Sequence, residues 1–143
     1  MNILVWLFLI LTIFSIIWTI PLLLMVSRSG VMMGRLRGGL ALKRHRRWVN
    51  RFLLTTLISV LFIESLIRMQ YGYEGGRLLD TLTGQIHVIG DIVYAISLIC
   101  MRFWLTGLTS KRWHRILFKL VLVSYSVIIA TGAVLMYELM SKA

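Results

Sequence analysis

The sequence predicts an all-α integral membrane protein whose four transmembrane helices pack as an antiparallel bundle. Two observations lead to this prediction. The 143 residues are 59% hydrophobic and only 15% charged, whereas a soluble domain is about half apolar and about a quarter charged. The Lys and Arg residues also gather in two clusters that alternate with long apolar runs. That alternation is typical of a chain that crosses a bilayer several times.

The two basic clusters predict the orientation of the chain. Of the sixteen Lys and Arg residues, eight lie between Arg28 and Arg51 and five lie between Arg102 and Lys119, and neither stretch holds an acid. Loops rich in Lys and Arg stay on the cytoplasmic side of a membrane. We therefore expect both clusters in the cytoplasm, which places the N-terminus and the C-terminus outside.

Four apolar runs approach or exceed the length of about 20 residues that a helix needs to cross a bilayer. The predicted spans cover approximately residues 3–26, 52–69, 81–108 and 116–137, with a basic cytoplasmic loop over residues 27–51. For that loop two interpretations stay open: a short surface helix with a basic face, or a linker without regular structure. All 143 residues are expected to form one membrane domain.

The first apolar run is expected to be a retained span and not a cleaved signal peptide. No basic residue precedes it, and its length exceeds the ~7–15 residues of a signal-peptide core. In the last span, Ser126, Ala130 and Ala133 fall on one helix face. Small residues let helix backbones approach closely in lipid, so this face is expected to pack against another helix.

Three ionisable residues inside the second and third spans are the first candidates for a functional site. Glu64 and His87 each lie about six residues from the outer end of their span, and Asp91 lies one turn beyond His87 on the same helix face. A short hairpin joins the two spans, so we expect these side chains to converge in the outer half of the bundle. A charge in hydrocarbon costs several kcal/mol unless it is paired, which makes each such residue a functional hypothesis.

A histidine beside carboxylates supports several kinds of chemistry, which the sequence leaves open. Histidines that hold a metal or haem commonly donate their second N–H to a carboxylate. The same group can relay protons near neutral pH or hydrogen-bond a quinone carbonyl. The purely structural alternative is charge neutralisation, in which Glu64 pairs with Arg68 and Asp91 pairs with His87.

Two further histidines lie in the basic clusters. His45 precedes the second span and His114 precedes the fourth, so both are expected at cytoplasmic helix ends. Two histidines at one depth on two helices can hold a haem between them, which makes His45, His114 and His87 candidate haem or metal ligands. The alternative is a pair of interfacial histidines among arginines that bind lipid headgroups. The candidate headgroup-binding residues are Arg44, Arg46, Arg47, Arg112 and Arg115.

The sequence lacks the common motifs of soluble enzymes. GxSxG, HExxH, Walker A and GxGxxG sequences are absent. The single Cys100 excludes an internal disulfide and a CxxC pair. The net charge of +11 does not predict a nucleic-acid partner, because the spans leave little surface in water. We expect no independent catalytic activity, and we expect membrane lipids and a larger membrane protein complex as partners.

Several short motifs occur in an order that resembles a known family. They are His45-Arg46-Arg47, Arg68-Met69-Gln70-Tyr71-Gly72, Tyr73-Glu74-Gly75-Gly76, Ile86-His87, Trp113-His114-Arg115 and residues 130–137. Over residues 42–140 the chain is similar to the small bacterial four-helix membrane family that includes CtaM/YozB-like proteins. The resemblance implies a role near haem–copper terminal oxidases, where relatives act in oxidase maturation. It also implies that His45, His87 and His114 match the family's histidines.

The chain departs from the family pattern at two places. Many members carry a further histidine near the outer end of the second span, where this chain has Glu64 and Arg68. The arginine-rich first loop is also unusual for the family. These departures suggest a member with a changed role, for example a small fixed subunit of a redox complex.

The expected function is therefore assembly or stabilisation of a membrane redox complex, foremost a respiratory haem–copper oxidase, in the bacterial cytoplasmic membrane. One alternative is a permanent structural accessory subunit of a larger membrane redox complex. The other is a small b-type cytochrome or a quinone-reactive protein that uses His87 or the His45 and His114 pair. Haem b, copper and quinone stay open as cofactors.

Overall fold

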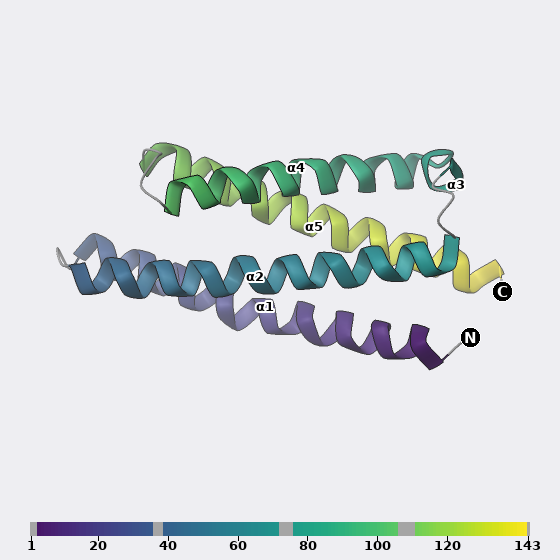
Figure 1. The fold of residues 1–143 in the computed structure, drawn as a ribbon, viewed down its shortest axis with the longest axis horizontal. Helices are drawn as coiled ribbons and strands as arrows, with labels where there is room; N and C mark the ends of the chain where they lie inside the picture. Colours follow the sequence, from purple (N-terminus) through teal and green to yellow (C-terminus); the bar gives the residue numbers. More distant parts are fainter. Residues whose placement is uncertain (1–2, 36–38, 72–75, 106–110, 143) are drawn as a thin grey trace. The chain divides into compact units, whose positions relative to one another are not determined.

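The described part of the chain is helical almost throughout and contains no strand, which confirms the all-α prediction (Figure 1). The computed structural model describes residues 3–35, 39–71, 76–105 and 111–142. Four long helices occur in these ranges, together with the single-turn helix α3. The elements are α1 (Ile3–Arg35), α2 (Gly39–Tyr71), α3 (Gly76–Leu79), α4 (Leu82–Leu105) and α5 (Lys111–Lys142).

Each of these four long helices is long and apolar enough to cross a membrane, as expected for a multi-pass membrane protein. The spans, assigned by length and composition, are Ile3–Val31, Gly39–Met69, Leu82–Met101 and Arg112–Glu138. Large apolar side chains cover the outside of these helices, and the side chain of Phe14, for example, is 63% exposed. Soluble proteins rarely expose continuous apolar surface, so hydrocarbon is the solvent that this surface fits.

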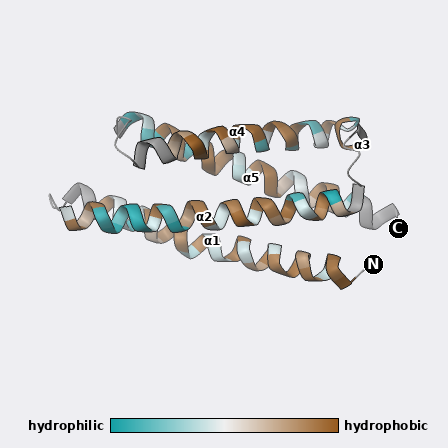
Figure 2. Cartoon of the chain, in the orientation of Figure 1, coloured by the Kyte–Doolittle hydropathy of each residue, from teal (hydrophilic) through white to brown (hydrophobic). Residues whose placement is uncertain are grey.

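The basic stretch is helical over residues 27–35 and 39–51, and these turns belong to two long helices and not to one short surface helix or to a linker. Helix α1 continues to Arg35 and α2 begins at Gly39. Lys and Arg are good helix formers, and no proline interrupts the stretch. A 33-residue helix is about 50 Å long, whereas the hydrocarbon core is ~30 Å thick. The helices therefore carry their charges beyond the apolar layer, and Figure 2 shows hydrophilic residues gathered in the first turns of α2.

The start of the fourth long helix differs from the prediction for the same reason. Helix α5 begins at Lys111 and not at residue 116, whereas the predicted end of the third span at residue 108 lies outside the described residues. The second basic turn therefore contributes the first residues of α5. In the outer hairpin, Glu74 lies outside the described residues.

The chain divides into two compact units, Met1–Phe62 and Ile63–Ala143, and α2 runs through the boundary. In the first unit α1 lies antiparallel to the first part of α2 (Figure 1). The rings of Phe8 and Phe62 meet edge to face at 5.8 Å. Some twenty residues further along α1, Ser29 Oγ lies 2.9 Å from Nδ1 of His45. These two contacts fix the register of the pair.

One face of α1 carries small polar residues at the spacing of a helix–helix seam. Hydroxyl groups of this kind allow close helix packing in lipid, provided that each hydroxyl has a hydrogen-bond partner. Thr12 donates to the Phe8 carbonyl at 2.7 Å, and Thr19 donates to a carbonyl of its own helix in the same way. The buried residues of this face are Val5, Thr12, Ser15, Thr19, Leu22, Val26 and Ser29.

In the second unit α4 and α5 pack side by side (Figure 1). Gly90 lies at a close approach, because a Cβ atom there would stand 3.3 Å from Cγ1 of Ile128. One turn further along α4, the rings of Tyr94 and Tyr125 lie 6.2 Å apart. The face predicted for packing is not the one that α5 turns to α4: Ser126, Ala130 and Ala133 are exposed. The buried face of α5 comprises Leu117, Val121, Ser124, Tyr125, Ile128, Gly132 and Leu135.

Candidate functional site

The structure brings Glu64, His87 and Asp91 together in the second unit. Glu64 comes from the last turns of α2, whereas His87 and Asp91 lie one turn apart on α4. Nε2 of His87 lies 2.9 Å from Oε1 of Glu64 and 3.8 Å from Oδ2 of Asp91. The imidazole is completely buried, and the two carboxylates are each about three-quarters buried. A histidine and two acids thus meet inside spanning helices.

Helix α5 completes the surroundings of the histidine. Oγ1 of Thr131 lies 2.7 Å from Nδ1 of His87. The next residue, Gly132, leaves room for the ring, since a Cβ atom there would stand 3.6 Å from Cε1 of His87 and 2.9 Å from Cγ2 of Ile63. A larger residue at Gly132 would push α5 away from both neighbours. Thr131 therefore positions the imidazole through its hydroxyl, and Gly132 leaves the space that the ring occupies.

The contacts of Thr131 determine which ring nitrogen carries a hydrogen. Oγ1 of Thr131 lies 2.7 Å from the carbonyl oxygen of Val127. Two oxygens so close need a hydrogen between them, and only the hydroxyl can supply it. The same Oγ1 therefore accepts from Nδ1 of His87, and the ring carries a hydrogen on Nδ1. In the neutral tautomer the lone pair of Nε2 then points toward the two carboxylates.

The short contact between His87 and Glu64 consequently needs a positive charge or a shared proton. A bare lone pair on Nε2 would repel a carboxylate oxygen at 2.9 Å. A proton on either group resolves the repulsion, and so does a cation that both atoms bind. Nε of Arg68 lies 3.7 Å from Oε2 of Glu64, but its side chain is 64% exposed. Arg68 therefore partly neutralises Glu64 from the rim of the cluster.

The donor atoms fit a transition-metal ion. One ligand atom from each of the three residues lies within 4.8 Å of the others. Metal bonds of about 2.0–2.2 Å place neighbouring ligand atoms roughly 3–3.5 Å apart, so modest side-chain movement would complete the site. Oδ1 of Asp91 is buried and has no hydrogen-bond partner within the described ranges. The bond from Nδ1 to Thr131 is the kind of outer contact that orients a histidine ligand.

The cluster fits a haem less well. Both ring nitrogens of His87 already have partners, at 2.7 Å and 2.9 Å. An axial haem ligand needs open space beyond its coordinating nitrogen, in the plane of the ring. The carboxylates of Glu64 and Asp91 occupy that space beside Nε2. Of the predicted roles of His87, a metal ligand and a proton carrier agree best with its surroundings.

The other two candidate histidines belong to different units, so a haem shared between them stays a prediction. His45 is buried in the first unit and contacts Ser29. His114 is half-buried near the start of α5, where its ring lies 6.4 Å from that of Phe118. Each of the two side chains is held by residues of its own unit.

The arginines predicted to bind headgroups lie on the first turns of two helices. Arg44 and Arg47 are exposed on α2 and Arg46 is half-buried there, while Arg112 and Arg115 are exposed on α5. Their role in lipid binding stays a prediction. Comparison with family models, curated proteins and solved structures found no match to this chain.

Two site residues were missed by the sequence interpretation, Thr131 and Ser29. Each places a hydroxyl against a histidine from a neighbouring helix. The available signal was a polar residue inside an otherwise apolar span. That signal is weak, because most such hydroxyls bond only to their own helix, as Thr12 does.

Proposed function

We propose that this chain assists the assembly or stabilisation of a membrane redox complex, with a respiratory haem–copper oxidase as the expected partner. The observation that carries the proposal is the convergence of Glu64, His87 and Asp91 within spanning helices. Mixed imidazole and carboxylate donors suit copper, iron and zinc ions. The motif resemblance to proteins of oxidase maturation supports the same class of partner.

The exposure of the three side chains suggests how the site works. His87 is fully buried, whereas the side chains of Glu64 and Asp91 are 23% and 24% exposed. The carboxylates thus reach the surface of the unit, where an ion can be received or passed on. His87 holds its lone pair toward them because Thr131 fixes the tautomer. A bound ion would replace the proton that His87 and Glu64 otherwise share.

The proposed location is the bacterial cytoplasmic membrane, with both chain ends outside. The cations near residues 28–51 and 111–119 then meet the inner leaflet. In this orientation the Glu64 cluster lies in the outer half of the membrane. Such a position suits the delivery of a metal ion to the partner complex from the outer side of the membrane.

The test compares Asp91→Asn with Asp80→Asn in the native host. Asp91 belongs to the cluster, whereas Asp80 lies in the turn before α4 and serves as the matched control. We expect the Asp91 variant to accumulate as a folded protein, to lose bound metal after tag-free purification, and to lower terminal oxidase activity in membranes severalfold. The Asp80 variant should match the wild type. Unchanged metal content and oxidase activity in the Asp91 variant would mean that the cluster only neutralises buried charge.

Two other outcomes would replace the proposal. A colourless, metal-free chain that co-purifies in fixed stoichiometry with a larger complex would identify a permanent accessory subunit. A haem absorption band that disappears on His45→Ala or His114→Ala would identify a small b-type cytochrome. In either case oxidase activity should not depend on Asp91.

A further inference from the structure

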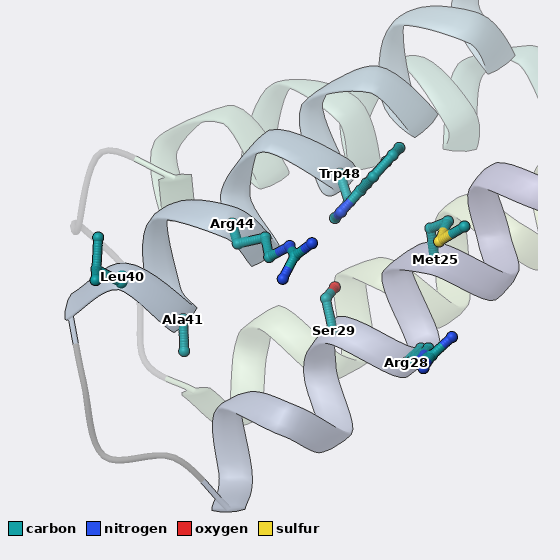
Figure 3. A pocket seen from close by; sticks show the side chains of 7 residues that line it. All are labelled: Met25, Arg28, Ser29, Leu40, Ala41, Arg44 and Trp48. Carbon is teal, nitrogen blue, oxygen red and sulfur yellow. The ribbon is translucent and has the colours of Figure 1, made fainter.

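A cavity of about 470 Å³ lies between α1 and the first turns of α2, within the first unit (Figure 3). Four of its lining residues are polar: Arg28 and Ser29 from α1, and Arg44 and Trp48 from α2. This volume is in the usual range of small-molecule sites. The cavity belongs to the first unit, whereas Glu64, His87 and Asp91 belong to the second.

The polar wall of the cavity consists mainly of hydrogen-bond donors. Figure 3 shows the Arg44 guanidinium and the Ser29 hydroxyl reaching into the space between the helices, with the indole nitrogen of Trp48 facing it. Guanidinium and indole N–H groups donate and cannot accept. The Ser29 hydroxyl is already engaged, at 2.9 Å from both the Val26 carbonyl and Nδ1 of His45. A ligand here has to supply acceptors, and the positive charge favours an anion.

The first unit has no acid that could neutralise this wall. Residues 1–62 contain eight Lys and Arg residues and neither Asp nor Glu. The first acid in the chain is Glu64, which is occupied by His87 and Arg68 in the other unit. The counter-ion for Arg28 and Arg44 therefore comes from outside this unit.

The remaining wall is apolar and lies at the ends of two spans. Met25, Leu40 and Ala41 line this side. The apolar stretch of α1 gives way to basic residues from Arg28 onward, and α2 carries basic residues before its apolar stretch, so we place the cavity near the headgroup layer. Arginine and tryptophan are the residues that favour this depth. A ligand that fits has an anionic head and an apolar body.

We propose that this cavity binds the phosphate-bearing headgroup of an anionic phospholipid. Arg44 holds the phosphate, the Trp48 N–H donates to it, Met25 contacts the apolar part of the lipid, and Arg28 adds positive charge at the edge of the cavity. Cζ of Arg51 lies 5.0 Å from the centre of the Trp48 ring, which holds the indole in place by a cation–π contact. The site is more specific than a basic surface, because it uses Arg28 and the shape of the cavity.

The proposal is tested by native mass spectrometry of the full chain in detergent with equal amounts of phosphatidylglycerol and phosphatidylcholine. The wild type should retain phosphatidylglycerol preferentially. Arg44→Gln should weaken that retention about fivefold, as expected for loss of one cation near the phosphate. Lys43→Gln is the matched control: Lys43 is exposed on the same helix but does not line the cavity, so retention should stay near the wild-type value.

A second variant tests the shape of the cavity independently of its charge. Ala41→Phe fills the cavity without changing any charge, and it should weaken retention as Arg44→Gln does. Ala95→Phe, at an exposed alanine of α4, should have no effect. Helicity measured by circular dichroism confirms that each variant is folded.

Three results would overturn the proposal. Equal losses in the Arg44 and Lys43 variants would mean that a diffuse basic surface binds the lipid. Full retention in Ala41→Phe would exclude the cavity. Displacement of the lipid by inorganic phosphate at the same concentration would assign the site to a soluble anion.

Discussion

At the scale of single residues, the hydroxyl of Thr131 decides the state of His87. It accepts from Nδ1 of His87 because its own hydrogen goes to the Val127 carbonyl. Thr131→Val keeps the shape and removes that acceptor. A buried N–H without a partner costs about 1–3 kcal/mol, so the unfolding midpoint in detergent should fall. Thr131→Ser, which retains a hydroxyl, should stay near the wild type.

The same variant tests the orientation of His87 as a ligand. Loss of an outer hydrogen-bond partner typically lowers metal affinity by about 10–100-fold. Titration of the purified chain with Cu²⁺ should show a loss of this size for Thr131→Val and little loss for Thr131→Ser. Equal affinity in Thr131→Val and the wild type would mean that Nδ1 plays no part in holding the ring.

Counting residues from the ends of the predicted spans was enough to predict that Glu64, His87 and Asp91 meet. It did not predict the contact of Thr131 with His87. Glu64 and His87 lie at similar distances from a short hairpin, and Asp91 follows His87 by one helical turn. Those are local relations, which the chain itself fixes. Thr131 is 44 residues from His87, and its contribution depends on the rotation of α5 against α4. A single sequence does not specify that rotation.

At the scale of elements, the seam between α4 and α5 depends on Gly90. A Cβ atom there would stand 3.3 Å from Ile128 and 3.4 Å from Val127, so Gly90→Leu cannot fit without moving a helix. Overpacking of this kind costs about 1–3 kcal/mol. The unfolding midpoint of Gly90→Leu should therefore fall, while Ala95→Leu, on the exposed face of the same helix, should be neutral. Equal midpoints for both variants would place the seam elsewhere.

Hydropathy predicted that four spans exist but misplaced several of their ends. It marks where the apolar segment ends, whereas the backbone stays helical as long as good helix formers follow. Arg44, Arg46 and Arg47 therefore lie on α2 and not on a loop. The same helical continuity creates the cavity at Arg28 and Trp48, because two regular helices bring their basic ends together. An irregular loop would not build such a wall.

At the scale of the whole molecule, the orientation in the membrane stays a prediction from charge. It is tested in a Cys100→Ser background with single substitutions Lys43→Cys, Arg112→Cys and Asp80→Cys. A membrane-impermeant thiol reagent added to intact cells should label only the Asp80 variant. The other two should react after permeabilisation. Labelling of the Lys43 and Arg112 variants from opposite sides would contradict the four-span topology.

The two compact units contain different chemistry, which the sequence indicated only in part. Residues 1–62 carry cations without acids, and residues 63–143 carry all five acids. The charge clusters were visible in the sequence, and so was the unusual occurrence of acids within spans. The pairing of His45 with Ser29 was not, because it depends on how α1 and α2 align.

The most direct measurement is electron paramagnetic resonance of Cu²⁺ added to the tag-free chain in detergent. Copper binds nitrogen and oxygen donors most tightly among the common divalent ions, so it is a sensitive probe of the Glu64, His87 and Asp91 cluster. We expect one equivalent to bind, with hyperfine coupling to a single imidazole nitrogen that His87→Phe removes and Asp91→Asn weakens. A copper signal without nitrogen coupling, or one that His87→Phe leaves unchanged, would contradict a metal site at this cluster.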